Sequence, residues 1–339
     1  LNNIFMLQGL KKLFKFFSII IIFLFVCFIL SQGKIYPKED LKYGITFSKK
    51  QAESLGFEWK KVYLAALDDL GVKKIRLPAY WDQVEPDGGE FFWDDMDWQV
   101  NEAQKRGAEI ILAVGGRLPR WPECHFPNWT KDLPKEDREQ KMLAYIEETV
   151  KRYNGNKAIV AWQVENEPFL SHFGDCPKLD KQFLDKEIGL VKKFDSRPIV
   201  ITDSGELSTW ISAFKRANIF GTTMYRDTYS SNLKMYIHYP IAPGFFRFKK
   251  NVASFFSSSP QKLVVIELQA EPWAPIPYQN ASQEERDRTM NLEKFKKIID
   301  FSSQTGFNEF YLWGVEWWYW EREINNNPAV WEEAKKLFK

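Results

Sequence analysis

The sequence is poor in the residues that build metal centres and disulfide frameworks. Its 339 residues include three cysteines and three histidines, and no two histidines stand at the His-x-x-x-His spacing of a zinc site. Two cysteines, Cys124 and Cys176, lie outside the apolar N-terminal segment, and they could form one disulfide or remain two free thiols. The counts argue against a catalytic zinc ion and leave the state of the two thiols open.

An excess of positive charge is also missing. The formal net charge is +2, with acids and bases interspersed, so no basic stripe marks a nucleic-acid surface. No Gly-x-Gly-x-x-Gly turn follows the first apolar run, and Gly115-Gly116 is an isolated pair, which argues against an open nucleotide-binding sheet. No linker, low-complexity segment or repeat interrupts the chain beyond its N-terminal segment. That part therefore reads as one large domain.

A long uncharged run is confined to the N-terminus. Three lysines precede the run from Phe16 to Leu30, a pattern typical of an export signal or an uncleaved anchor. Fifteen residues is short against the roughly 20 of a spanning helix, but no clear small-x-small cleavage site follows, so cleavage and retention both stay open. We expect residues 1–33 to be a signal peptide or a transmembrane signal-anchor. The protein would then be exported, either secreted or membrane-anchored at the cell surface.

Apolar runs alternate with amphipathic stretches over the rest of the chain. Eight runs read as β-strands, at residues 42–48, 72–78, 108–115, 158–164, 198–203, 219–225, 263–267 and 309–314. Helical patterns fall between many of them, at residues 59–70, 93–106, 137–153, 179–194 and 283–305. Eight such strands in about 300 residues predict an α/β protein, a single (β/α)8 TIM barrel over residues 34–339.

Two glutamates stand at the ends of two of these strands. Glu167 follows the fourth run in the sequence Asn166-Glu167-Pro168, and Glu267 ends the seventh. A carboxyl group at a buried strand end costs desolvation energy unless it has a partner or a task, and barrel enzymes take their catalytic groups from these ends. Glycoside hydrolysis requires two such carboxyls, one as acid and one at the anomeric carbon. Glu165 and Glu271 stand close by, and alternation places Glu165 on the same strand face as Glu167, so geometry alone does not choose.

Tryptophan is abundant, with 14 residues, all beyond residue 58. Tryptophan at this density indicates a large core or stacking platforms for flat ligands such as sugar rings. Several aromatic and basic residues follow predicted strands: Trp81, Arg117, Trp121, Trp273, Trp317 and Trp318. We expect Trp81 and Trp273 to bind substrate, with ordinary packing as the alternative for each of the set.

These motifs together resemble the retaining (β/α)8 glycosidases of glycoside hydrolase clan A, in particular the family 5 cellulase-like enzymes. In that clan the fourth strand ends in Asn-Glu, where the glutamate is the acid/base, and the seventh ends in the nucleophile. The resemblance implies that Glu167 and Glu267 are catalytic and that Asn166 bonds the sugar 2-hydroxyl. It covers roughly residues 42 to 320.

The same resemblance assigns roles to other strand residues. It implies that two residues form hydrogen bonds with the nucleophile: Arg76 in the second strand and Tyr225 at the end of the sixth strand. It also implies that Trp313, at the end of the eighth strand, forms the floor of the sugar site. Arg76 would hold Glu267 as an anion, while a more apolar or anionic setting would raise the pKa of Glu167 and keep it as an acid.

The chain departs from the family pattern in two places. The nucleophile is usually followed by Phe-Gly or a similar pair, whereas Leu268-Gln269 follows Glu267 here. His125 and His238 lie near the strands that carry histidines in family 5, but away from the strand ends.

The sequence therefore predicts a retaining β-glycosidase, a hydrolase of O-glycosidic bonds in a β-linked oligo- or polysaccharide that works by double displacement. The resemblance implies no metal or organic cofactor. Two alternatives stay open: a catalytically silent glycan-binding barrel at the cell envelope, and a transglycosylase that uses the same residues. The expected partner is carbohydrate, not nucleic acid, and the membrane is contacted through the N-terminal segment if that segment is uncleaved. The sugar, the linkage, endo or exo action and the oligomeric state do not follow from the sequence.

Overall fold

A computed structural model describes residues 31–170, 173–178, 180–260 and 262–339, together with residues 14, 15, 18 and 29. Most of the expected signal or anchor segment, residues 1–33, lies outside the described residues. Within the described part, no helix has the length and apolar character needed to cross a membrane.

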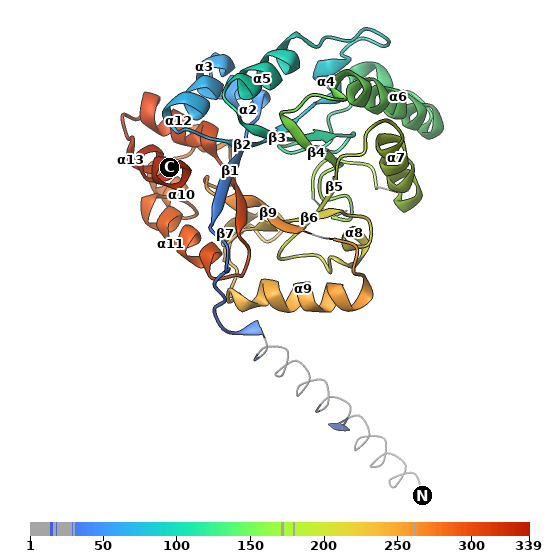
Figure 1. Cartoon of the computed structure of the whole chain (residues 1–339). Coiled ribbons are helices and arrows are strands. Elements are labelled where there is room, and N and C mark those ends of the chain that lie inside the picture. Colours follow the sequence, from blue (N-terminus) through green and yellow to red (C-terminus); the bar gives the residue numbers. More distant parts are fainter. Residues whose placement is uncertain are drawn as a thin grey trace, which may run out of the picture.

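Eight parallel strands close into a barrel in which β10 pairs back onto β1 (Figure 1). The strands are β1 (Lys42–Thr46), β2 (Lys74–Pro78), β3 (Glu109–Val114), β4 (Ile159–Val164), β5 (Ile199–Asp203), β6 (Ile219–Met224), β9 (Lys262–Gln269) and β10 (Glu309–Trp313). The predicted single (β/α)8 barrel is confirmed. Every observed strand end lies within two residues of the predicted one because each strand is a short apolar run bounded by polar or turn residues.

Helices surround the barrel (Figure 1). They are α2 (Lys49–Ser54), α3 (Trp59–Leu64) with a π-helical turn (Ala65–Asp69), α4 (Trp81–Val84), α5 (Asp94–Lys105), α6 (Lys135–Tyr153), α7 (Lys181–Phe194), α8 (Ile211–Phe214), α9 (Gly244–Phe256), α10 (Gln283–Asp287), α11 (Leu292–Ser303), α12 (Val315–Ile324) and α13 (Ala329–Lys335). Short 3-10 turns occur at Asn128–Thr130, Tyr278–Asn280 and Lys336–Phe338.

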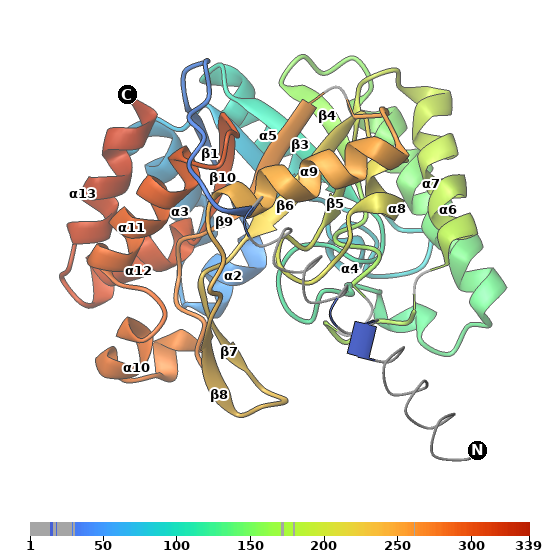
Figure 2. The same cartoon turned by 90° about the horizontal axis from the view of Figure 1, so that it is seen from below.

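One predicted helix is wrong. The stretch 283–305 is not continuous but divides into α10 and α11. Asn291 begins α11 with an extended backbone and a side chain that accepts a hydrogen bond from the Lys294 amide, which is the preferred role of asparagine at a helix start. Neither α9 nor the antiparallel hairpin of β7 (Asp227–Ser230) and β8 (Met235–His238) is predicted from the sequence. Figure 2 shows this hairpin projecting from the barrel, and it follows the carboxyl end of β6.

The core has two layers. A small cluster drawn from β3, β4, β5, β9 and β10 contains Ile111, Ala161, Val200, Val264, Ile266 and Tyr311. A much larger cluster joins the barrel strands to the helices. Six tryptophans of the described residues are fully buried: Trp81, Trp162, Trp210, Trp317, Trp318 and Trp331. Close packing on both faces fixes the strands, so polar side chains at their carboxyl ends are held in defined positions.

Candidate active site

Glu267 reaches the site because β9 carries one extra residue. Pairing with β6 moves from Thr222–Val265 directly to Thr223–Glu267, and pairing with β10 shifts over the same stretch. Such a bulge interrupts the strict alternation of side chains and re-aims one of them. Ile266 consequently belongs to the inner apolar cluster while the next side chain, Glu267, meets the charged groups at the strand ends.

Arg76 of β2 connects three elements at this end of the barrel. Its guanidinium is completely buried and donates through Nη1 to Glu267 Oε1 at 2.6 Å and through Nη2 to Asn166 Oδ1 at 2.6 Å. Its Nε donates to Gln163 Oε1 at 2.7 Å. A guanidinium fixed by three acceptors is a rigid cation, and charge-assisted bonds of this kind are about twice as strong as neutral ones. The structure therefore brings Arg76 to the carboxylate that the sequence assigned to it.

Tyr225, just after β6, supplies a second donor. Its hydroxyl donates to Glu267 Oε2 at 3.0 Å. Burial, followed by the nearby Glu267 charge, raises the pKa of Tyr225 well above its usual value, so the phenol remains a donor throughout the working pH range. Both oxygens of Glu267 thus accept hydrogen bonds, and its side chain is 5% exposed. That environment suits an ionised carboxylate held in one orientation.

Glu167 meets a different environment at the end of β4. Its backbone amide donates to Thr202 Oγ1 at 2.7 Å, which fixes the residue, but no donor among the described residues reaches its carboxyl group. Burial raises the pKa of Glu167 well above its usual range, and the charges of Glu267 and Glu123 add to this effect. This environment favours the protonated form of Glu167, next to a carboxylate group that accepts hydrogen bonds on both oxygens.

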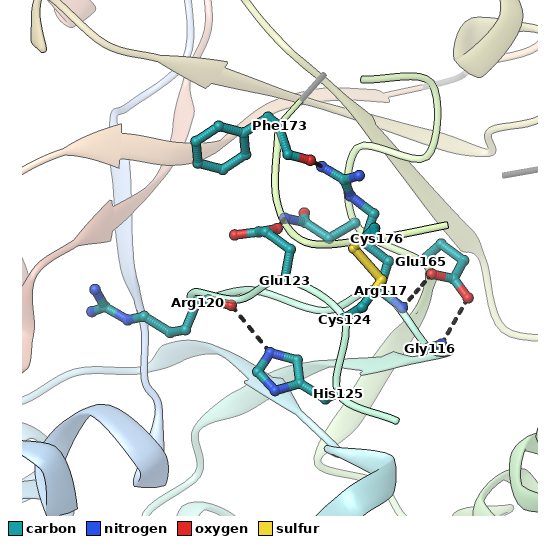
Figure 3. Close-up of a disulfide and its surroundings, with 10 residues drawn as sticks. Gly116, Arg117, Arg120, Glu123, Cys124, His125, Glu165, Phe173 and Cys176 are labelled. Carbon is teal, nitrogen blue, oxygen red and sulfur yellow. Dashed lines mark hydrogen bonds between the residues drawn. A yellow bond between two sulfur atoms is a disulfide. The ribbon is translucent and has the colours of Figure 1, made fainter. Parts of the chain in front are cut away.

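Glu165 does not share the face of Glu167, so the expected alternation fails here. Strand β4 ends at Val164, and both glutamates have left-handed backbones, with φ of 59° at Glu165 and 42° at Glu167. The Glu165 carboxylate accepts hydrogen bonds from the amides of Gly116 at 2.8 Å and Arg117 at 2.6 Å (Figure 3). It therefore holds the loop after β3 and leaves Glu167 as the site carboxyl.

That loop contributes a third carboxyl group, Glu123, which the sequence did not indicate. Glu123 Oε2 accepts from Asn166 Nδ2 at 3.1 Å. Burial raises the pKa of Glu123 to about 7, against the opposing charge of Arg117. The adjacent Cys124 is joined to Cys176 by a disulfide with a Cα–Cα separation of 5.3 Å, so this loop is tied to the segment after β4 (Figure 3).

Arg120 of the same loop crosses the site to the far strand ends. It forms an ion pair with Glu271 and donates through Nη2 to Glu316 Oε2 at 2.7 Å. The indole N–H of Trp313 donates to Glu271 Oε1 at 2.8 Å, and the Arg120 guanidinium lies 4.2 Å from the Trp313 ring centre. Glu271 is thus bound into a structural network, and one face of the expected sugar floor is covered by an arginine.

The tryptophans singled out from the sequence divide into two groups. Trp81 is fully buried in α4, where its N–H donates to Glu85 Oε2 at 2.8 Å and its ring stacks on Tyr145. Its expected contact with substrate is therefore wrong, because α4 begins directly after β2 and turns the indole into the core. Trp317 and Trp318 are buried in α12 in the same way.

Trp273 belongs to the second group, at the rim of the site. Its ring centre lies 5.2 Å from that of Tyr225 and 5.7 Å from that of Phe173. Trp121, which is 71% exposed, continues this aromatic rim at 6.3 Å from Phe173. The rim begins at Tyr225, whose hydroxyl bonds Glu267, and extends outward through Trp273, Phe173 and Trp121.

Two groups were missed in the sequence: Arg120, directly before Trp121, and Glu123, directly before Cys124. Both have left-handed backbones, with φ of 86° and 73°. The one available signal was the pairing of Cys124 with Cys176, which would have placed this loop beside the end of β4. His125 packs on Tyr80 and contacts the Arg120 carbonyl at 3.1 Å, so it supports the loop.

Solved structures of glycosidases share this fold. The chain aligns with xylanase 10B from Thermotoga petrophila at a TM-score of 0.56 and 13% identity, over 88% of this chain and 94% of that one. It aligns with an exo-β-1,4-mannosidase from an Opitutaceae bacterium at a TM-score of 0.58 and 12% identity, over 91% and 61% of the two chains. These likenesses concern the fold.

Curated relatives match shorter stretches. A β-galactosidase of Clostridium cellulovorans is 23% identical over 42% of this chain and 25% of its own length, and endo-1,4-β-xylanase 3 of Hypocrea jecorina is 30% identical over 30% and 27%. Mannan endo-1,4-β-mannosidase A of Emericella nidulans is 22% identical over 39% and 36%. The match spans about a third or less of the relatives' own lengths.

A family model gives the longer match. The model of the cellulases, described as glycosyl hydrolase family 5, covers residues 47–240, more than half of the chain. This region runs from the end of β1 to the second strand of the hairpin and includes Arg76, Glu123, Asn166, Glu167 and Tyr225. The chain therefore belongs to glycosyl hydrolase family 5.

Proposed function

We propose that this protein is a retaining β-glycosidase that hydrolyses O-glycosidic bonds of a β-linked oligo- or polysaccharide. The observation that carries the proposal is the contrast between two neighbouring carboxyls, Glu267 held by two donors and Glu167 kept protonated by burial and charge. A retaining mechanism requires one group of each kind. The relatives named above, a β-galactosidase, a xylanase and a mannosidase, support β-linked carbohydrate as the substrate class.

Two displacements follow from this arrangement. In the first, Glu267 attacks the anomeric carbon while Glu167 gives its proton to the glycosidic oxygen, so the C–O bond breaks and a glycosyl ester forms on Glu267. In the second, the Glu167 carboxylate takes a proton from water as the water oxygen attacks the anomeric carbon. The sugar is released with its original configuration, and both glutamates return to their starting states.

Asn166 is positioned to bind the sugar beside this pair. Its Oδ1 is occupied by Arg76, and its Nδ2 donates to Glu123. An amide nitrogen carries two protons, so one remains for the sugar 2-hydroxyl. This contact strengthens as positive charge develops at the anomeric carbon.

Two aromatic surfaces would meet the rest of the substrate. Trp273, with Phe173 and Trp121, provides a rim on which a neighbouring sugar can stack. The face of the Trp313 ring that Arg120 covers is not available for stacking. A sugar there meets the guanidinium, which favours recognition of hydroxyl groups by hydrogen bonds over ring stacking.

We further propose that the protein is exported, with residues 1–33 as a signal peptide or membrane anchor and residues 34–339 as the glycoside hydrolase domain. The disulfide between Cys124 and Cys176 supports an oxidising compartment, because such bonds persist there and are rare in the cytosol.

Trapping the glycosyl-enzyme tests the catalytic proposal. The full chain, Glu267→Gln and the matched control Glu271→Gln would be incubated with activated 2-deoxy-2-fluoro β-glycosides of several sugars, followed by intact-mass and peptide-mass measurement. We expect one added sugar on the peptide that carries Glu267 in the wild type and in Glu271→Gln, and none in Glu267→Gln. An adduct on Glu271 would move the nucleophile, and glycan binding without any adduct or turnover would indicate a silent barrel. Added oligosaccharide acceptors would reveal transglycosylation.

A further inference from the structure

The outer face of α9 is apolar, although nothing in the described structure covers it. Phe255 is 86% exposed, Phe256 51% and Val252 38%. With the half-buried Phe248 they stand at the i, i+4, i+7, i+8 spacing of one helix face. We call these four residues the α9 stripe. Isolated exposed apolar residues need no explanation, but a contiguous stripe with phenylalanines this exposed marks a contact surface.

The stripe is not needed to hold α9 on the barrel. The opposite face of the helix buries Phe246 and Ala253 completely. Lys249 on that side donates to the carbonyl of Gly205. The helix therefore has two apolar faces, and only one of them contributes to the core.

The chain that follows the apolar N-terminal run is fixed against this helix. The Gly244 amide donates to the Gly33 carbonyl at 3.0 Å, and a Cβ at Gly244 would come within 2.7 Å of the Ser31 carbonyl oxygen. Ile35 in turn donates to the Gln304 carbonyl at 2.7 Å. Figure 1 shows α9 beside the point where this N-terminal chain joins the barrel. A groove of about 920 Å³ lies between residues 32–35 and α9, and the whole α9 stripe lines it.

Positive charge borders the stripe without acidic counterparts. Lys34 and Arg247 line the groove. No acidic residue lines the groove within the described part of the chain, and α9 itself contains none. An apolar stripe flanked by unpaired cations has the composition of a helix that lies in the interface of an anionic bilayer.

We propose that α9 rests on an anionic lipid surface, with Phe255 and Phe256 inserted between the lipids and Lys34 and Arg247 against phosphate groups. The lipid is chosen over another protein because the uncharged run Phe16–Leu30 ends within three residues of Gly33, which contacts α9. A bilayer that takes up that run would therefore lie close to the start of α9. The proposal rests on retention of the N-terminal segment, and it is independent of the catalytic residues.

A fluorescent label read on the full chain tests this contact. In a Cys27→Ser background the two remaining cysteines are joined to each other, so a single new thiol at position 255 (Phe255→Cys) takes a polarity-sensitive NBD dye. The matched control is Leu233→Cys at the tip of the β7–β8 hairpin, also an exposed apolar residue at 64%. With phosphatidylglycerol vesicles we expect a blue shift and a severalfold rise in emission at position 255, quenched by shallow spin-labelled lipids, and water-like emission at position 233.

The cations provide a second readout. Each is worth about 1 kcal/mol at an anionic surface, so Lys34→Gln with Arg247→Gln should weaken insertion of the label by on the order of tenfold or more, and added salt should do likewise. Vesicles of phosphatidylcholine alone should give a smaller emission change.

Three outcomes would overturn the proposal. Water-like emission at position 255 on a chain that sediments with vesicles would show an anchor without α9 contact. Absence of vesicle binding would show that neither the N-terminal segment nor α9 contacts the membrane. A blue shift without lipid that grows with protein concentration would place a second copy of the chain on the α9 stripe. Turnover of an aryl β-glycoside in the same samples keeps these outcomes separate from failure of the catalytic proposal.

Discussion

The ends of β4 and β9 present the same side chain in opposite environments. Glu267, after the bulge in β9, accepts hydrogen bonds from Arg76 and Tyr225 on its two oxygens. Glu167, at the end of β4, is buried to a similar degree but receives no hydrogen bond on its carboxyl from any described residue and faces two other carboxyls. Burial is common to both groups and cannot account for their different roles. The neighbours decide which one keeps its proton.

The difference also shows how the two environments depend on each other. Arg76 and Tyr225 stabilise the charge of Glu267. Among the neighbouring charges, this one raises the pKa of Glu167 most. Each donor on Glu267 therefore supports the acid at β4 indirectly. Changes on either side should be visible in the pH dependence of both steps.

The largest effect is expected from removal of the nucleophile. Glu267→Gln keeps the shape of the side chain but cannot form the glycosyl ester, so we expect kcat to fall by about 10⁴-fold to 10⁶-fold on aryl β-glycosides. Steady-state kinetics measure the loss. Glu271→Gln, which removes a buried carboxylate bound to Arg120, should retain turnover. Equal loss in both variants would mean that the shared network, and not the Glu267 carboxylate, supports the reaction.

Removal of the acid should give a loss that depends on the leaving group. Glu167→Gln should lower kcat/KM by about 10²-fold to 10⁴-fold on unactivated β-linked oligosaccharides. Dinitrophenyl β-glycosides, whose leaving group needs no proton, should lose far less in the first step, and azide should accelerate the second because it needs no base.

The pH profile sharpens the same test. In the wild type, activity should fall as pH rises through the raised pKa of Glu167, because the protonated form is the acid. Glu167→Gln should abolish this basic limb. A limb that persists unchanged would assign it to another group, with Glu123 as the first candidate because its pKa of about 7 lies in the working range.

Much of the comparison between β4 and β9 could be anticipated from the sequence. Apolar runs of five to eight residues fixed the strands, and the family resemblance placed Arg76 and Tyr225 beside Glu267, where the structure has them. These contacts lie between strand ends, and strand ends of a closed barrel have few alternative positions.

Sequence patterns did not predict the conformations of the loops. Glu165 and Glu167 separate because the backbone after Val164 is left-handed, and no periodicity predicts that. Arg120 and Glu123 reach the site from a loop shaped by two left-handed residues and a disulfide. Trp81 was misplaced because a helix begins directly after β2.

A smaller effect is expected at the second donor to Glu267. Tyr225→Phe removes one hydrogen bond to a charged group, worth about 1.5–3 kcal/mol, so kcat should fall by about 10-fold to 100-fold with little change in KM. The ring can stay against Trp273, which makes the change local. Arg76→Lys should cost more, since an ammonium cannot bond Gln163, Asn166 and Glu267 together. A larger loss from Tyr225→Phe than from Arg76→Lys would contradict this ranking.

The smallest effect on turnover is expected from Glu123→Gln, which should lower kcat/KM by less than about tenfold because the amide can still accept from Asn166. Its effect on pH dependence should be clear. The Glu123 charge raises the pKa of Glu167, so its removal should move the basic limb of the activity profile to lower pH.

Stability gives an independent measure of the same group. The pKa of Glu123 rises from 4.5 to about 7 on folding, so between these values the folded protein holds more protons than the unfolded chain and its stability falls as pH rises. Glu123→Gln should reduce this fall by the contribution of Glu123, about 3 kcal/mol at most, and the remainder should persist because the pKa values of Glu167 and Asp203 are also raised. Denaturant titrations at pH 4.5, 6 and 8 measure it, with Glu271→Gln as the matched control. If the wild type and Glu123→Gln lose stability in parallel across this window, Glu123 does not have a raised pKa in the folded protein. The contrast between β4 and β9 would then rest on Glu167 and Glu267 alone.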